Sequence, residues 1–206
     1  MLSRLRDYFF PPPIEDVAAL RRFLSGEASY IAQRATYEFS RNTLAWFGQH
    51  HFGDDKFNEA FAVCRWESYA AILAGMVVLT RGHLLSAGVH HDALPAPLTR
   101  LYAEALGEYP VPAHRPEGWR DIEEALLGRL RALGADARPE VRAVAAAAAT
   151  RAFETLPVLS RDKDEDRRVI TGAVTFGMIS FADRLRTRVD AGSVVERLDP
   201  ARPSGS

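Results

Sequence analysis

The sequence predicts an all-α protein, a single-domain bundle of six or seven helices around one buried central helix at about residues 54–85. Apolar side chains recur at intervals of three and four along most of the chain, as in amphipathic helices. Prolines and glycines stand where such helices begin and end, and no alternating β-branched run bounded by hairpin turns interrupts them. With 47% hydrophobic and 26% charged residues, the chain is able to bury a core.

The expected helices follow an N-terminal arm at residues 1–13. They lie at about residues 13–25, 27–49, 54–85, 96–106, 117–133, 139–157 and 162–190. Pro13 suits the first turn of the first helix, and Gly26 is expected to end it. Asp54 or Asp55 is placed to cap the third helix.

The third helix is the predicted centre of the fold because it is apolar on nearly all sides, which is typical of a helix enclosed by others. Its apolar run, Tyr69–Thr80, is shorter than the roughly 20 residues that cross a bilayer. We therefore expect a core helix and no transmembrane segment.

The second half of the helical domain, which spans residues 14–190, begins after a proline-rich linker at 110–116. Its sequence, PVPAHRP, precludes a regular helix. Gly134 and Pro139 separate the next two helices, and Asp162 with Glu165 has the spacing of a capping box. Residues 191–206 are expected to form a flexible tail.

Composition excludes several classes of function. The 26 basic residues nearly balance the 27 acidic ones, so the chain has no overall field for nucleic acid, and we expect no nucleic-acid partner. Cys64 is the only cysteine, which rules out an intrachain disulfide and a cysteine-rich zinc site. The first ten residues lack the features of a signal peptide. These observations favour a cytoplasmic protein.

The second helix provides the first candidate site. Five side chains fall on one side of it: Tyr30, Arg34, Tyr37, Glu38 and Arg41. Tyrosines offer rigid contact area, and arginines offer planar donors for a carboxylate, a phosphate or a partner helix. The alternative interpretation is an ordinary solvated face with charge pairs four residues apart.

Charged residues inside the apolar third helix provide the second candidate. Glu59, Arg65 and Glu67 lie there, and a charge buried in a core must be paired and hydrogen-bonded. Glu38 and Arg41 of the preceding helix are the expected partners. Such a network either fixes the register of the helices or lines a polar ligand pocket.

Histidine pairs provide a third, weaker candidate. They are His50 and His51 followed by Asp54 and Asp55, and His90 and His91 followed by Asp92. Imidazole and carboxylate groups bind metals. Adjacent histidines in polar loops are more often simply exposed, however, and no supporting second set of ligands is evident, so no residue is assigned to a metal.

These features predict a non-catalytic helical binding module that recognises a protein partner or a small anionic or amphipathic ligand. The predicted site residues are Tyr30, Arg34, Tyr37, Glu38, Arg41, Arg65 and Glu67. One alternative is a helical enzyme with an isoprenoid-like or cofactor-like substrate, which would use a metal or the carboxylates of Glu59 and Glu67. Another is a structural or assembly subunit. The sequence identifies no cofactor, and a homodimer or a peripheral membrane contact through residues 1–10 is compatible with it.

Overall fold

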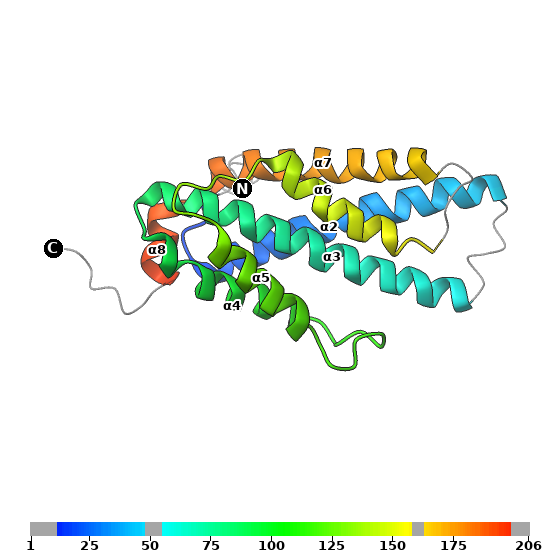
Figure 1. Ribbon diagram of the computed structural model, residues 1–206, viewed down its shortest axis with the longest axis horizontal. Coiled ribbons are helices and arrows are strands. Elements are labelled where there is room, and N and C mark those ends of the chain that lie inside the picture. The colour runs from blue at the N-terminus through cyan, green and yellow to red at the C-terminus, as the bar shows by residue number, and fades with distance from the viewer. Residues whose placement is uncertain (1–11, 48–54, 158–162, 199–206) are drawn as a thin grey trace, which may run out of the picture.

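The computed structural model describes residues 12–47, 55–157 and 163–198, with the side chains of residues 37–47 left out. This part of the chain forms seven α-helices and no β-strand, as the sequence predicts (Figure 1). The helices are α2 (Val17–Phe47), α3 (Asp55–Leu84), α4 (Pro95–Leu106), α5 (Arg120–Ala132), α6 (Val141–Glu154), α7 (Lys163–Arg188) and α8 (Ala191–Leu198). Two short 3-10 helices, η2 (Leu85–Ala87) and η3 (His91–Ala93), connect α3 to α4.

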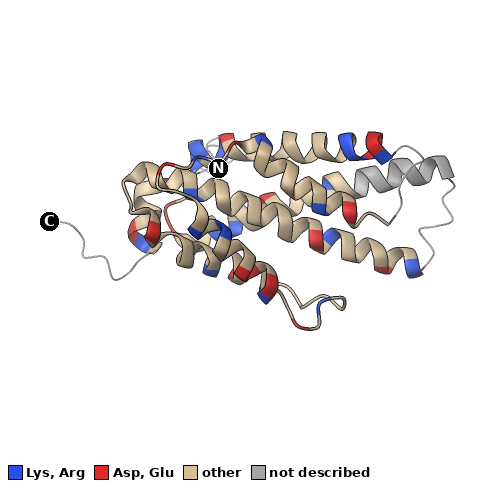
Figure 2. Cartoon of the chain, viewed as in Figure 1, with Lys and Arg blue, Asp and Glu red and all other residues tan. Residues whose placement is uncertain are grey.

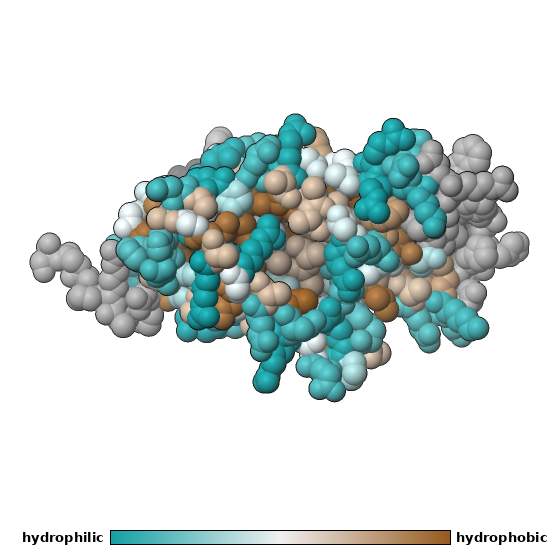
Figure 3. Space-filling view, in the orientation of Figure 1, coloured by the Kyte–Doolittle hydropathy of each residue, from teal (hydrophilic) through white to brown (hydrophobic). Residues whose placement is uncertain are grey.

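The helix α3 is central, as predicted. It contacts α2, α4, α6, α7 and α8, and Figure 1 shows it between α6 and α7 on one side and α4 and α5 on the other. The segment Asp55–Ala87 is long and apolar enough to cross a membrane, and 67% of its most hydrophobic window is buried inside the bundle. On the face seen in Figure 3, hydrophilic side chains are spread over apolar ones that reach the surface between them.

Small residues let the central helices approach closely. A Cβ atom at Gly75 of α3 would lie 3.0 Å from Cγ1 of Val144 on α6. A Cβ atom at Gly177 of α7 would lie 2.7 Å from Cγ1 of Ile31 on α2. The alanine run of α6 also presents small side chains to the core, because Ala145, Ala148 and Ala149 are buried. The packing of α2, α3, α6 and α7 therefore depends on missing side-chain volume as well as on apolar side chains.

One predicted break does not exist, because the expected helices at 13–25 and 27–49 form the single helix α2. Gly26 lies inside it, between Leu24 and Ala28, and both of these are completely buried. A glycine inside a helix costs about 1 kcal/mol relative to alanine, while burying a leucine side chain stabilises by about 1.5–3 kcal/mol. The continuous apolar face therefore outweighs the local preference of glycine.

The start of α2 also differs from the prediction. Pro13 lies outside the helix, and Asp16 caps it by accepting a 2.7 Å hydrogen bond from the backbone N–H of Ala19. Ile14 is buried and forms an isolated bridge with Val189, the residue that follows α7. This bridge ties the beginning of the described chain to the junction between α7 and α8.

Two boundaries in the second half are corrected as well. The helix expected at 117–133 begins only at Arg120, because Gly118 adopts a left-handed conformation with φ +77°. The expected flexible tail at 191–206 begins with α8, which buries Val194, Val195 and Leu198. Asp190 caps α8 through a 2.8 Å hydrogen bond from the N–H of Ser193. Residues 199–206 lie outside the described part.

The contact between Gly177 and Ile31 gives a test of the packing. Gly177→Ala should lower the unfolding free energy by about 1 kcal/mol, because overpacking costs about 1–3 kcal/mol and alanine regains about 1 kcal/mol of helix propensity. Gly128→Ala is the control, since a Cβ atom at Gly128 of α5 meets nothing within 4 Å. It should raise the unfolding free energy. Urea denaturation compares the two variants, and an equal gain in both would contradict the close approach of α2 and α7.

Candidate functional site

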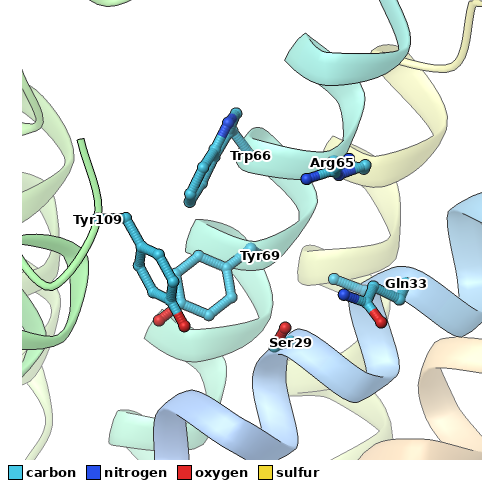
Figure 4. A pocket seen from close by; sticks show the side chains of 7 residues that line it. Ser29, Gln33, Arg65, Trp66, Tyr69 and Tyr109 are labelled. Carbon is cyan, nitrogen blue, oxygen red and sulfur yellow. The ribbon is translucent and has the colours of Figure 1, made fainter. Parts of the chain in front are cut away.

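A small pocket lies between α2 and α3, next to the point where the chain leaves α4. Its lining residues are Ser29, Ala32, Gln33, Arg65, Trp66, Tyr69 and Tyr109 (Figure 4). Spacings of three and four residues bring these side chains to facing sides of the two helices. The pocket has a volume of about 190 Å³, which is small for a ligand site.

Three aromatic rings form one end of the pocket. Trp66 and Tyr69 come from α3, and Tyr109 follows α4. The ring centroids lie 5.4 to 6.1 Å apart in edge-to-face contacts, so the rings pack on one another as a continuous wall. The hydroxyl of Tyr69 is 2.9 Å from Oγ of Ser25, and burial raises the pKa of Tyr69 to about 12. Tyr69 is therefore a neutral, fixed part of this wall.

The other end of the pocket is polar. Figure 4 shows Arg65 and Gln33 across from the three rings, with the hydroxyl of Ser29 below them. Arg65 and Gln33 are exposed, and Arg65 forms no hydrogen bond or ion pair with the residues that the structure describes. The pocket thus joins an apolar wall to an arginine that has no hydrogen-bond partner among the described side chains.

A second polar cluster surrounds Glu67, which is buried on α3. Its Oε1 accepts hydrogen bonds from Nε2 of His114 (2.9 Å) and Nε of Arg115 (2.5 Å). Its Oε2 accepts them from Nη2 of Arg115 (3.0 Å) and from Nε and Nη2 of Arg151 (3.0 and 2.8 Å). The linker and α6 are therefore joined to the central helix through one carboxylate.

Arg115 is held on two further sides. Its Nη1 donates to both carboxylate oxygens of Asp121, at 2.8 and 3.0 Å, and its guanidinium lies 4.5 Å from the centroid of the Trp119 ring. These contacts use every nitrogen of the guanidinium. We call Glu67, His114, Arg115 and Arg151 the Glu67 cluster.

The contacts within the Glu67 cluster stabilise the ionised form of Glu67 and the protonated form of Arg115. Burial alone would raise the pKa of Glu67, but hydrogen bonds from Arg115, Arg151 and His114 outweigh burial and lower the pKa from 4.5 to about 2. The hydrogen bond to Glu67 in turn raises the pKa of Arg115. Glu67 is therefore ionised near neutral pH and serves as an anchor for two arginines.

The sequence-predicted site residues whose side chains the structure describes, Tyr30, Arg34, Arg65 and Glu67, do not form one site. Arg65 lines the aromatic pocket, whereas Glu67 lines hollows formed with the linker, α5 and α6. Tyr30 and Arg34 lie elsewhere, in a groove of about 380 Å³ between α2 and α7, where Nη1 of Arg34 donates to the Tyr30 hydroxyl at 3.2 Å. The side chains of Tyr37, Glu38 and Arg41 lie outside the described part.

The described partners of Glu67 are Arg115, Arg151 and His114, so this buried charge is paired, as expected. The side chains of Glu38 and Arg41, the partners expected for the charges of this helix, lie outside the described part. The described partners lie 47 to 84 residues further along the chain than Glu67. The sequence did contain a signal for these contacts. His114 and Arg115 stand among the prolines of the linker PVPAHRP, and a proline-rich segment restricts where such side chains lie.

Two other expectations concern acids and metals. Glu59 is exposed on α3, whereas Glu67 is buried and hydrogen-bonded to Arg115, Arg151 and His114. The ligand atoms of His90, His91 and Asp92 lie within 4.8 Å of one another at the surface. His50, His51 and Asp54 lie outside the described residues.

Comparison of the chain with protein-family models, curated proteins and solved structures gave no match.

The Glu67 cluster predicts a specific pH dependence of stability. The pKa of about 2 in the folded state lies below the ordinary 4.5, so the stabilisation is complete above pH 4.5 and is lost as the pH falls toward 2. Glu67→Gln should lower the unfolding free energy by about 2 kcal/mol at pH 7, because two arginines lose their counter-charge. The difference from the wild type should shrink as the pH falls from 4.5.

Glu154→Gln is the matched control, since Glu154 contacts Arg151 at 3.8 Å on the surface. It should change the unfolding free energy by less than about 0.5 kcal/mol at any pH. Urea denaturation between pH 3 and 7 measures all three proteins. A constant difference between the wild type and Glu67→Gln across that range would show that the carboxylate charge does not stabilise the fold.

Proposed function

We propose that this protein is a non-catalytic binding module for a small amphipathic anion, which is held in the aromatic pocket between α2 and α3. The observation that supports the proposal is the combination of the three-ring wall with the exposed guanidinium of Arg65 in one pocket. A ligand with an aromatic or apolar body and a carboxylate head satisfies both ends.

Recognition would follow from ordinary side-chain chemistry. The guanidinium of Arg65 presents parallel N–H donors that match the two oxygens of a carboxylate, and the amide of Gln33 offers a further donor. The ring of the ligand would pack against Trp66 and Tyr109, where aromatic contacts add about 0.5–1.5 kcal/mol beyond area burial.

Volume limits the ligand. A cavity of about 150 Å³ holds a molecule such as benzene, so the pocket of about 190 Å³ has room for one ring and a short acidic group. Nucleotides and other large cofactors exceed it. Such a small ligand buries little surface, and we expect a dissociation constant between about 10 μM and 1 mM from the affinity typical per atom.

Binding is favoured over chemistry by the titratable groups near the pocket. Tyr69 keeps its proton, with a pKa of about 12. Glu67 is hydrogen-bonded to Arg115 and Arg151, and it lines a different hollow. The described residues that line the pocket include no aspartate, glutamate, histidine or lysine, side chains that commonly act as general acids or bases.

Calorimetric titration with phenylacetate tests the proposal. Wild-type protein should bind it, and Arg65→Gln should weaken binding at least tenfold while leaving the melting temperature nearly unchanged, because Arg65 is exposed and forms no ion pair with a described residue. Arg100→Gln is the control, because Arg100 is also an exposed arginine but lies on α4, away from the pocket lining. This variant should bind like the wild type. 2-Phenylethanol, which lacks the carboxylate, should bind more weakly and respond little to Arg65→Gln.

Two results would overturn this function. One is the absence of phenylacetate binding at 5 mM, and the other is equal affinity in the wild type and Arg65→Gln. Trp66→Ala separates the two ends of the pocket, because it should weaken both ligands.

A second candidate is recognition of a protein partner on the other side of α2. The observation that favours it is the exposed pair Tyr30 and Phe176, which border the groove between α2 and α7. A partner bound there should be lost with Tyr30→Ala and retained with Arg65→Gln.

A further inference from the structure

The solvent side of α7 has the residue spacing of a helix-pairing seam. Exposed or half-exposed residues follow one another at intervals of four and three: Glu165, Val169, Gly172, Phe176, Ile179, Asp183 and Arg186. Such a repeat of 3.5 residues is the pattern with which one helix packs along another. The opposite side of α7 is already buried in the bundle, so α7 has apolar residues on both sides.

The middle of this seam is apolar and uncovered. Phe176 is 65% exposed and Val169 is 50% exposed, and they are two of the most exposed large apolar side chains among the described residues. Figure 2 shows that the charges of α7 lie at its two ends and leave the middle of the helix uncharged. An apolar strip with charged ends is typical of a buried interface with a polar rim.

The order of the charges identifies the partner. Glu165 and Arg168 lie toward the beginning of α7, and Asp183 and Arg186 lie toward its end. The point between Thr175 and Phe176 is equally far from Glu165 and Arg186, and also equally far from Arg168 and Asp183. Reversing the helix about this point therefore places an acid opposite a base at all four positions.

We infer that two copies of this chain pair through α7, antiparallel, about a two-fold axis beside Phe176. Phe176 of each copy would pack near its counterpart, with Val169 and Ile179 on either side. Glu165 of one copy would face Arg186 of the other, and Arg168 would face Asp183. The same surface serves both copies, which is the usual form of a two-fold interface.

Charge favours this arrangement over its alternatives. A parallel pair in the same register would place Glu165 against Glu165 and Arg168 against Arg168, which is repulsive. An unrelated protein would need the reverse order of the same charges, whereas a second copy has it by symmetry. Within each chain, Arg168 lies 3.9 Å from Glu165, and Arg186 pairs with Asp183. In the dimer, the first ion pair of one copy would meet the second ion pair of the other, which gives a group of four alternating charges at each end of the seam.

The seam is long enough to align two helices over several turns. From residue 165 to residue 186 a helix extends about 32 Å. A stable interface covers about 800 Å² on each partner, so the adjacent groove with Tyr30 of α2 would have to contribute to the contact as well.

Sedimentation velocity between 5 and 100 μM tests the pairing. The wild type should sediment as a dimer, with twice the 22.8 kDa mass of the chain. Phe176→Asp should sediment as a monomer with an unchanged circular dichroism spectrum, because the side chain is exposed within one chain. Val111→Asp is the matched control, since Val111 is 57% exposed in the linker, and it should remain dimeric.

A charge exchange tests the antiparallel direction. Arg168→Glu and Asp183→Arg should each weaken the dimer about tenfold or more, because each places like charges together at both ends. The double variant should recover to within about threefold of the wild type. A monomeric wild type at 100 μM, a dimer unaffected by Phe176→Asp, or a double variant weaker than both single ones would overturn this arrangement.

Discussion

The carboxylate of Glu67 is the constraint on which the arrangement around the candidate site depends. It lies buried on the most enclosed helix of the described chain, where an unpaired charge would cost several kcal/mol. Arg115 of the linker and Arg151 of α6 supply the compensating positive charges. Because Arg115 of the linker binds Glu67, and Tyr109 just before the linker packs against Trp66, the linker is held against α3 at both sides. An otherwise irregular segment thereby forms part of a defined pocket.

Consecutive residues of α3 serve different surfaces. Successive side chains on a helix differ in direction by about 100°, so Trp66 and Glu67 meet different neighbours although they adjoin in sequence. Trp66 contributes to the aromatic wall beside α2, and Glu67 contacts the linker and α6. The same separation holds across α2, where Gln33 lies at the pocket and Tyr30 lies toward α7. The proposed ligand pocket between α2 and α3 therefore lies apart from the proposed pairing surface on α7 and the groove beside it.

The sequence was sufficient for the helical class and for the central helix, because both follow from apolar periodicity over long segments. It was insufficient where local preference and burial disagree. Gly26 resembles a helix end but lies in the continuous α2, since Leu24 and Ala28 are buried on either side of it. In the candidate site, the sequence indicated that Glu67 would need a partner, yet Arg115 and Arg151 are distant in the chain. Neither spacing nor composition specifies contacts over such distances.

That distance has a consequence for the folding pathway. Glu67 lies 48 residues from Arg115 and 84 residues from Arg151 along the chain, and contacts between distant residues form only after the loop entropy between them has been lost. The ion pairs of Glu67 would then close late, after α3, α4 and α6 have assembled. Interactions that are absent from the transition state act mainly on the unfolding rate. One buried carboxylate would therefore determine how long the native bundle persists, with little influence on how fast it forms.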